Sequence, residues 1–266
     1  MNEKRTLSII VINYKSASLM KQCIFSVSKQ LQKEHIDYEW IVVNNSPSEH
    51  LFDNKELRVR VINSSTNEGF ARGCNKGAKK AKGEILWFLN PDTEYKKGSI
   101  SSVISLLQEK NNVGIVGNQL INENEKIQKW AFGKTLTFWV WLENKIIPNK
   151  PIQFKKIQKV GWVSGASCMI RKNTFFLIEG FDEKYFMYFE DMDFCLRLFN
   201  TTKLSSLHTP FLCIRHLGGK SFKNNKKKQK RWYYTSMRRY AQKHLPWWQK
   251  YFFSFLTRCA ERCIFI

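Results

Sequence analysis

Several features that commonly assign a protein class are missing from this chain of 266 residues. None of its 7 cysteines forms a CxxC pair, so neither a zinc ribbon nor a disulfide framework is predicted. No run reaches the roughly 18 uninterrupted apolar residues that a membrane-spanning helix needs. The apolar run after the charged start is too short for a secretory signal. We therefore expect a reduced, cytoplasmic protein.

Common catalytic and phosphate-binding motifs are absent as well. The chain contains neither GxGxxG nor GxxxxGK[ST], so dinucleotide-binding and P-loop proteins are not indicated. GxSxG and HExxH are also missing, which argues against α/β-hydrolases and zinc proteases.

Acidic residues are scarce relative to basic ones. Lys and Arg total 44 against 22 Asp and Glu, a formal net charge of +22. From Phe194 onward there are 16 Lys and Arg but a single acid, Glu261, so most of the excess lies in the last quarter of the chain. A basic excess of this size predicts a polyanionic partner, which is nucleic acid, an anionic membrane surface or a phosphorylated substrate.

Short β-branched runs alternate with helical patterns in the first hundred residues. We expect strands at 7–12, 39–43, 58–62 and 84–89, and helices around 19–31 and 70–81. This alternation predicts an α/β fold with a mostly parallel sheet and helices on both faces. Ligands of such sheets bind beyond the carboxyl ends of the strands, so the loops that follow these strands are candidate sites.

The pattern is less regular further along the chain. We expect a helix at 98–109, a strand at 113–116, hairpins and loops over 118–159, a strand-like segment at 160–170, a helix at 190–199 and a strand at 211–215. Beyond these, the composition becomes Lys-rich and then mixed basic and aromatic. The chain therefore divides into a catalytic or binding domain, residues 1–221, and a helical tail, residues 222–266.

Three polar sites stand out on this outline. Asp92, in Asn-Pro-Asp, directly follows a predicted strand, although the same composition is common in solvated turns. Glu190 and Asp191 begin a predicted helix among aromatic residues, where partial desolvation suits a general base, although helix starts often carry acids. Asp193 is four residues before Arg197 and is expected to form a structural salt bridge. His216 becomes a plausible metal ligand only with a carboxylate nearby.

Taken in order, these segments resemble the family 2 glycosyltransferases with the GT-A fold, most closely their rhamnosyltransferase-like branch. The resembling segments are IVINY (10–14), NEGFARGCNKG (67–77), LNPD (89–92), GASCMIR (165–171), GFDE (180–183), YFEDMDFCLR (188–197) and HLGGKS (216–221). The resemblance implies a Rossmann-like, mostly parallel sheet with helices on both faces. It also implies transfer of a sugar from a nucleotide diphosphate donor to an acceptor hydroxyl, with inversion.

The resemblance also implies roles for individual residues. Asp92 would be the metal-binding Asp of a DxD-like motif and His216 a second ligand, for Mg²⁺ or Mn²⁺. Asp191 would be the catalytic base and Glu190 would bind acceptor hydroxyls. Trp162 would contact the acceptor, or would be a core aromatic. The donor nucleotide and its sugar would be held by Asn13, Tyr14, Asn44, Asn67, Gly69, Arg72, Asn75 and Asn90.

One departure from the family pattern concerns the nucleotide base. The family usually carries Asp-Asn or Asp-Asp after the second strand, whereas this chain has Asn44-Asn45. An Asn carbonyl still accepts a hydrogen bond from a pyrimidine N3–H, so nucleotide binding is compatible with the change. Base preference or affinity would be the property affected.

The expected function is therefore an inverting glycosyltransferase of cell-surface polysaccharide synthesis. The favoured donor is dTDP-rhamnose, and the alternatives are UDP-galactofuranose, UDP-N-acetylglucosamine and UDP-glucose. A distant alternative is a nucleic-acid-binding protein, but the acids among the aromatics around Glu190 argue against binding phosphate chains, so no nucleic-acid partner is expected. The acceptor would be a saccharide, free or lipid-linked.

The tail carries a separate prediction. From Lys220 onward there are 13 Lys and Arg and one Glu, followed by many Trp, Tyr and Phe. Such composition favours an anionic membrane surface. We expect the protein to lie peripherally on the inner face of the cell membrane, although a tail packed on the domain would use the same aromatics.

Overall fold

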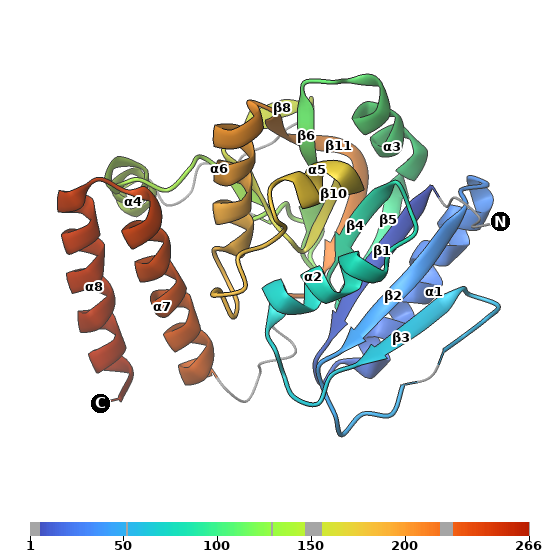
Figure 1. The fold of residues 1–266 in the computed structure, drawn as a ribbon, viewed down its shortest axis with the longest axis horizontal. Coiled ribbons are helices and arrows are strands. Elements are labelled where there is room, and N and C mark those ends of the chain that lie inside the picture. Colours follow the sequence, from blue (N-terminus) through green and yellow to red (C-terminus); the bar gives the residue numbers. More distant parts are fainter. Residues whose placement is uncertain (1–5, 52, 129, 147–155, 219–225, 266) are drawn as a thin grey trace.

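The computed structural model describes residues 6–51, 53–128, 130–146, 156–218 and 226–265. One mixed sheet forms its centre, with strand order β3-β2-β1-β4-β10-β6-β11-β5, and β8 pairs with β11 beside this path. Figure 1 shows α1 and α2 on opposite faces of the strands β1 to β3. This α/β fold, with helices on both faces of a central sheet and a helical tail, confirms the fold class predicted from the sequence.

The first half of the chain supplies the parallel strands. β1, β2 and β4 are buried along their whole length, as expected of central strands covered on both faces. The elements are β1 (Leu7–Asn13), α1 (Ala17–Lys33), β2 (Tyr38–Asn44), β3 (Val59–Asn63), α2 (Phe70–Lys80) and β4 (Ile85–Leu89). Each predicted element of this half is confirmed, with bounds shifted by at most two residues.

Strand register aligns the carboxyl ends of these strands. Asn13 is paired with Asn44, and Asn44 with Asn63, so the last residues of β1, β2 and β3 stand side by side. The polar loops that follow the strands therefore meet at one edge of the sheet.

The second half makes the sheet mixed. β10 runs antiparallel between β4 and β6, and β5 runs antiparallel to β11 at the sheet edge. The elements are β5 (Thr93–Gly98), α3 (Ile100–Glu109), β6 (Val113–Ile121), β7 (Phe132–Gly133), α4 (Phe138–Ile146), β8 (Gln158–Val160), β9 (Trp162–Val163), β10 (Ser167–Arg171), α5 (Lys172–Leu177), α6 (Glu190–Thr202) and β11 (Ser205–His216).

The structure differs from the sequence expectations for this half at three places. The segment at 160–170 is two strands, β9 and β10, separated by a turn that contains Gly165. β5 was missed because an edge strand with partly exposed residues lacks a continuous apolar run. α4 lies where loops were expected because no residue of α4 is fully buried and its pattern is weak.

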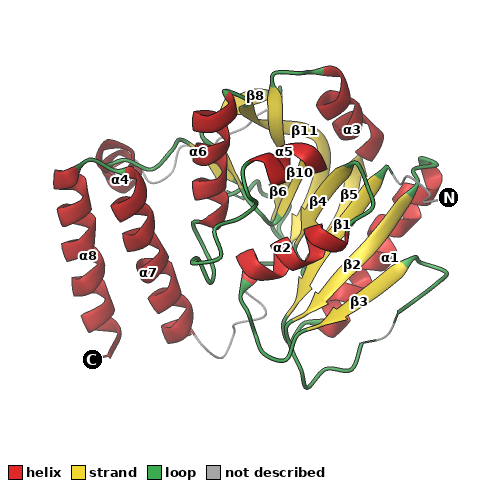
Figure 2. Ribbon diagram, viewed as in Figure 1, coloured by secondary structure: helices red, strands yellow, loops and turns green. Residues whose placement is uncertain are grey.

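Two further helices, α7 (Lys226–His244) and α8 (Trp247–Phe265), complete the chain. Figure 2 shows them as a helical hairpin beside α6 and α4. A second apolar cluster joins the hairpin to the main domain and consists of Leu136, Tyr185, Phe189, Met237, Tyr240, Ala241, Leu245 and Phe253. Among the described residues, no helix combines the length and the apolar character that crossing a membrane requires.

Candidate active site

Buried asparagines connect the ends of β1 and β2. The Asn13 amide donates to Asn44 Oδ1 at 3.0 Å and to Glu49 Oε2 at 2.8 Å. The Asn44 amide donates to the Glu49 carbonyl at 2.8 Å and to Asn63 Oδ1 at 3.0 Å, while Asn44 Oδ1 also accepts from the Ser46 backbone N–H at 3.1 Å. Asn44 is thus engaged within the protein at both ends of its amide.

The next asparagine holds the loop before α2. The Asn45 amide donates to the Gly69 carbonyl at 3.0 Å, and the Gly69 N–H donates to Asn67 Oδ1 at 3.0 Å. Two buried oxygens in the loop after β2, Asn45 Oδ1 and Ser46 Oγ, have no hydrogen-bond partner within the part of the chain that the structure describes. Because buried polar groups are normally satisfied, these two oxygens are candidates for contact with a ligand.

Gly69 occupies a position that only glycine fits. Its φ is +85°, and an added Cβ would lie 2.5 Å from the Phe186 carbonyl oxygen. That carbonyl accepts a hydrogen bond from the Phe70 N–H at 2.8 Å. The predicted donor loop and the segment before α6 are therefore in direct backbone contact.

The remaining predicted donor residues lie on α2 and after β1. Arg72 forms a 3.0 Å ion pair with Glu183 and stays half-exposed. The Asn75 side chain is buried, donating to the Phe181 carbonyl at 2.8 Å and accepting from the Phe181 N–H at 3.0 Å. Asn75 therefore holds the chain near Phe181. Tyr14 lies after β1 and is partly buried. Their donor-binding roles stay predictions.

The two predicted metal ligands come together from distant parts of the sequence. Asp92 Oδ1 and His216 Nε2 are 3.3 Å apart, because His216 at the end of β11 is paired with Thr93 at the start of β5. The Leu217 N–H donates to the Asp92 carbonyl at 2.9 Å. Asn90 also reaches the site, with its Nδ2 3.2 Å from His216 Nε2.

A residue that the sequence did not indicate orients His216. Gln128 Oε1 lies 2.9 Å from His216 Nδ1, and the Gln128 amide donates to the His216 carbonyl at 2.7 Å. With a proton on Nδ1 donating to Gln128, Nε2 carries its lone pair toward Asp92. Such a partner commonly fixes the tautomer and the ring orientation of a metal-binding histidine.

The donor set at this position fits a divalent cation. A carboxylate oxygen and an imidazole nitrogen that converge on one point are suitable ligands for Mn²⁺, and the carboxylate suits Mg²⁺. Among the described residues there is no cluster of three or more His, Cys, Asp or Glu side chains arranged to hold a metal. Asp92 and His216 would be two of the ligands.

Asp191 lies in the first turn of α6. Its Oδ2 accepts from the Gly165 N–H at 3.1 Å and its Oδ1 accepts from the Met192 N–H at 2.8 Å. Burial raises the pKa of Asp191 to about 6, against the lowering effect of these backbone hydrogen bonds. A carboxylate with a pKa close to neutral pH is suited to accept a proton.

Glu190 is more deeply buried than Asp191. Its side chain is 5% exposed, and burial together with the negative charge of Asp191 raises its pKa well above the ordinary value. Glu190 Oε2 has no hydrogen-bond partner among the described residues. A protonated Glu190 would leave the negative charge on Asp191. The predicted contact of Glu190 with acceptor hydroxyls stays a prediction.

One short segment connects Asp191 to the strand end that precedes Asp92. Gly165 holds Asp191, and the carbonyl of the next residue, Ala166, accepts from the Asn90 N–H at 2.9 Å. A Cβ at Gly165 would lie 2.9 Å from the Phe70 ring, so this close approach needs glycine. Trp162 lies three residues before Gly165, partly buried on β9, and its predicted acceptor contact stays untested.

The backbone before α6 is strained. Tyr188 and Phe189 have φ values of +68° and +65°, a region that costs non-glycine residues about 1 kcal/mol or more. Contacts from α7 hold this segment: Gln229 donates to the Tyr188 hydroxyl at 2.6 Å and Ser236 donates to the Met187 carbonyl at 2.7 Å. In this conformation the first turn of α6 contacts the Gly165 segment through Asp191.

Asp193 has the structural role that its spacing predicted. Its side chain is fully buried and pairs with Arg197 at 2.7 Å, with Lys243 at 2.7 Å and with His244 at 2.7 Å. Arg197 also donates to the Gly180 carbonyl at 2.7 Å. Burial would raise the pKa of Asp193, but the hydrogen bonds from His244, Lys243 and Arg197 and the charge of Arg197 hold that pKa below its ordinary value. Asp193 therefore connects α6 to α7.

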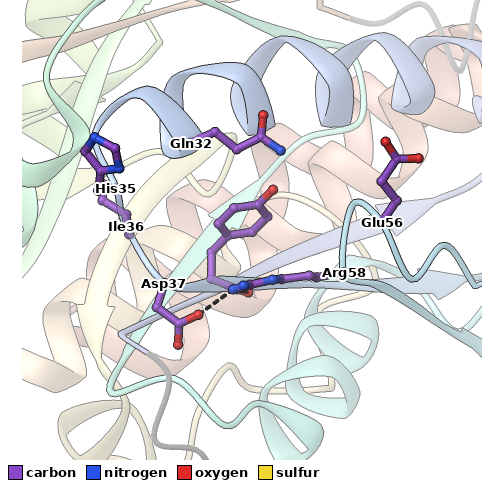
Figure 3. Close-up of a pocket in the computed structure, with 7 residues that line it drawn as sticks. Gln32, His35, Ile36, Asp37, Glu56 and Arg58 are labelled. Atoms are coloured by element: carbon purple, nitrogen blue, oxygen red, sulfur yellow. Dashed lines mark hydrogen bonds and ion pairs between the residues drawn. The ribbon is translucent and has the colours of Figure 1, made fainter.

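Two cavities lie at opposite edges of the sheet. One of about 290 Å³ borders Asp92, between α1 and the start of β5. The other, about 400 Å³, lies at the amino ends of β2 and β3, where Asp37 pairs with Arg58 (Figure 3). The second cavity contains none of the predicted site residues, which all lie at or near the carboxyl edge.

Sequence reasoning missed four residues of this site, namely Asn45, Ser46, Glu49 and Gln128. Asn45 was noted only as part of the departure from the family pattern and was given no role, and Ser46 and Glu49 belong to the polar loop after the second strand, where no motif assigned them a role. Gln128 carries no local signal, because its partner His216 is 88 residues away.

Residues 8–176, more than half of the chain, match the family model described as Glycosyl transferase family 2. A low-salt glycan biosynthesis hexosyltransferase of Haloferax volcanii is 28% identical over 203 residues, which are 72% of this chain and 61% of that protein. An N-acetylglucosaminyl-diphospho-decaprenol L-rhamnosyltransferase of Mycobacterium tuberculosis is 24% identical over 170 residues, 53% of each protein. This chain thus covers about half to three-fifths of the length of these curated relatives.

The fold is shared with a solved structure. The crystal structure of GalNAc-T7 with UDP, GalNAc and Mn²⁺ matches 91% of this chain and 48% of its own, with a TM-score of 0.66 and 16% identity. The family match includes the asparagines that end β1 and β2, the Asn-Pro-Asp turn and Gly165. This chain belongs to glycosyl transferase family 2.

Proposed function

We propose that this protein transfers a sugar from a nucleotide diphosphate donor to a saccharide acceptor hydroxyl, with inversion at the anomeric carbon, in the synthesis of a cell-surface polysaccharide. The single observation that carries the proposal is the Gly165–Ala166 segment. It binds the carboxylate of Asp191 and, through Asn90, the strand end that presents Asp92 beside His216. A base and a two-ligand metal position thereby face the same edge of the sheet.

Asp191 performs the proton transfer in this mechanism. Its carboxylate accepts the proton of the acceptor hydroxyl, and the resulting oxygen nucleophile attacks the anomeric carbon from the side opposite the diphosphate. The backbone N–H groups of Gly165 and Met192 hold both oxygens of Asp191, so the carboxylate does not rotate away from its target. Burial of the neighbouring Glu190 keeps that side chain from competing as the charged group.

Asp92 and His216 would hold Mg²⁺ or Mn²⁺. When bound, the cation neutralises the charge of the departing diphosphate. Gln128 keeps the His216 ring in position, and Asn90 lies against the same ring nitrogen as Asp92. These residues would therefore hold the cation that binds the leaving group.

The donor nucleotide would lie over the carboxyl ends of β1 and β2. Asn13, Asn44 and Glu49 form the floor of this position, and the unpartnered Asn45 Oδ1 and Ser46 Oγ are available acceptors. L-Rhamnose from dTDP-rhamnose is the favoured donor, which the rhamnosyltransferase among the relatives supports. UDP-galactofuranose, UDP-N-acetylglucosamine or UDP-glucose is the alternative, because a pyrimidine base fits the same acceptors.

A lipid-linked acceptor would place the enzyme on the inner face of the cell membrane as a peripheral protein. The relative from Mycobacterium tuberculosis, whose name specifies a diphospho-decaprenol acceptor, supports this acceptor class. The net charge of +22 supports an anionic membrane surface as partner. A nucleic-acid partner is not proposed, because the aromatic residues before α6 surround Glu190 and Asp191.

A panel of nucleotide sugars tests the proposal. The protein is incubated with each donor, a diphospholipid-linked or soluble saccharide acceptor, and Mg²⁺ or Mn²⁺, and the released nucleoside diphosphate is measured. We expect acceptor-dependent release of dTDP from dTDP-rhamnose that stops when the metal is chelated. Release from a UDP-sugar alone would select the alternative donor, and no release from any donor would refute the assignment.

A further inference from the structure

Helix α8 presents a row of exposed aromatic side chains. Trp247, Tyr251 and Phe255 are spaced four residues apart and are 72%, 73% and 72% exposed. Side chains at this spacing lie on one face of a helix. Trp248 and, on α4, Trp139 are exposed nearby. Large aromatic groups gathered on one exposed face mark an interaction surface more often than chance exposure does.

The other faces of α8 are already covered. Phe252 packs against Phe138 and Trp141 of α4 with ring centroids 4.9 and 5.2 Å apart, and Phe253 is fully buried in the cluster with α7. Tail packing on the domain therefore accounts for Phe252 and Phe253. It leaves the row Trp247, Tyr251 and Phe255 without a function in the fold.

The same face continues with basic residues. Arg258 and Arg262 follow Phe255 at helical spacing and are exposed. Thr235 and Arg238, in the middle of α7, donate to Glu261 at 3.0 Å each, and Figure 1 shows the start of α7 at the same end of the hairpin as the carboxyl end of α8. The exposed lysines and arginine at that end of α7 are Lys226, Lys227, Lys228, Lys230 and Arg231. The exposed aromatic row thus occupies the first half of α8, and the exposed basic residues gather where α7 begins, together with the exposed Tyr233.

We propose that this face of α8 docks on a lipid bilayer with anionic headgroups. The inference rests on the proposed function only for the lipid-linked acceptor. Trp, Tyr and Phe enter the headgroup and acyl boundary, while the basic end contacts anionic headgroups. That basic end also borders the active site, because Gln229 and Trp232 of α7 contact Tyr188 and Phe186 just before Glu190. Docking therefore brings the active site toward headgroups that carry diphosphate.

Two other occupants fit less well. Single-stranded nucleic acid would require aromatic and basic side chains interleaved along one groove, whereas the most exposed aromatic row, Trp247, Tyr251 and Phe255, lies on α8 and most of the exposed basic side chains lie at the start of α7. A second copy of the chain would bring two strongly basic hairpin ends into one assembly, which like-charge repulsion opposes. A bilayer accommodates the aromatic row and the basic residues at once.

The test is co-sedimentation of the full chain with vesicles of phosphatidylcholine alone or mixed with phosphatidylglycerol. The variant Trp247→Ser/Tyr251→Ser/Phe255→Ser removes the aromatic row. The matched control Phe176→Ser/Leu177→Ser/Phe199→Ser removes three exposed apolar side chains from α5 and α6. Arg258→Gln/Arg262→Gln tests the charge. Circular dichroism verifies that each variant is folded.

We expect the wild type and the matched control to bind mixed vesicles at low salt and the aromatic variant to bind about tenfold or more weakly. The arginine variant should lose part of the preference for anionic lipid. Equal vesicle binding by the aromatic variant and the wild type would overturn the proposal. A wild-type protein that binds neither kind of vesicle would overturn it as well.

Two further outcomes would assign the face to another partner and overturn the proposal. One is a wild-type dimer in solution that the aromatic substitutions convert to a monomer. The other is tight binding of a single-stranded oligonucleotide that the same substitutions abolish. Turnover with a water-soluble acceptor is measured in parallel. If the glycosyltransferase assignment is wrong, neither the wild type nor any variant shows turnover. If only the docking proposal is wrong, the aromatic substitutions change neither turnover nor vesicle binding.

Discussion

Asp191 combines a position that fixes both carboxylate oxygens with a raised pKa. We expect Asp191→Asn to lower transfer by about 10²–10⁴-fold, the usual loss when a general base is removed. Donor binding should remain close to that of the wild type, because the side chain faces the acceptor. Turnover and calorimetric donor binding measure the two effects. Glu143→Gln, an exposed acid on α4, serves as control, and wild-type turnover by Asp191→Asn would reject the base assignment.

The raised pKa of Asp191 predicts the pH dependence of the reaction. The base acts only when deprotonated, and burial moves its pKa from 3.8 to about 6. Turnover should therefore rise with pH through about 6 and level off above it. A profile measured between mildly acidic and mildly basic pH checks this. A rate that remains constant down to the ordinary pKa of an aspartate would contradict the assignment.

His216 depends on Gln128 for its orientation. We expect Asp92→Ala and His216→Ala to abolish the gain in donor affinity that Mg²⁺ or Mn²⁺ produces. Gln128→Ala should reduce that gain by about 10–100-fold, the usual effect of losing the partner of a histidine ligand. Donor titrations with and without the metal measure these gains.

A nearby substitution controls for damage to the turn. Asn124→Ala alters an exposed side chain a few residues before Gln128 and should leave the metal effect unchanged. A metal effect of wild-type size in the Asp92 and His216 variants would place the metal elsewhere.

At the scale of elements, α7 supports α6, the helix that carries Asp191, and the segment before it. It contacts the strained residues before α6 and supplies Lys243 and His244 to the buried Asp193. A chain that ends at Phe222 would lose these partners and expose Tyr185 and Phe189. Truncation is therefore a poor test of membrane binding, because it would also disturb the domain.

A point substitution isolates this support. We expect His244→Ala to lower the free energy of unfolding by about 1–3 kcal/mol, because Asp193 would remain buried with one fewer hydrogen bond. Turnover should also fall, because α6 carries Asp191. Denaturant unfolding and turnover are measured together. Gln242→Ala, an exposed neighbour on the same helix, should match the wild type in both, and a fully stable His244→Ala would show that Asp193 does not need this partner.

At the scale of the whole molecule, buried acids with opposite pKa shifts predict how stability depends on pH. Burial raises the pKa of Glu190 and Asp191. As pH falls, both groups therefore bind protons at a higher pH in the folded chain than in the unfolded chain. Stability should therefore increase as pH falls from 7 through about 6. Asp182 and Asp193 have lowered pKa values because of Lys243, Arg239, His244 and Arg197. Their contribution is present above the unfolded pKa of about 3.9 and is lost below it.

Stability is expected to be greatest at mildly acidic pH. Urea unfolding across the acidic range measures this, and Glu190→Gln is the informative variant because it removes one raised pKa. That variant should show a smaller gain between neutral and mildly acidic pH than the wild type. A gain that is identical in both proteins would show that Glu190 does not titrate in this range.

The sequence by itself determined the elements whose burial follows a simple period. β1, β2 and β4 were predictable because their continuous apolar runs are buried on both faces, and α1 because its apolar residues recur every four positions. The pairing of Asp193 with Arg197 was predictable because residues four apart on a helix are neighbours. The loops after the parallel strands followed from the same pattern, since parallel strands end at one edge.

Only the tertiary structure decided contacts between distant segments. Gln128 meets His216 across 88 residues, and Gly165 binds Asp191 across 26, and no local period encodes either contact. β5 and α4 escaped prediction because edge strands and half-exposed helices have weak apolar patterns. The tail composition was equally compatible with packing or exposure, because the same aromatics suit both. The structure buries Phe253 and leaves Trp247, Tyr251 and Phe255 exposed, because the other faces of α8 pack against α4 and α7.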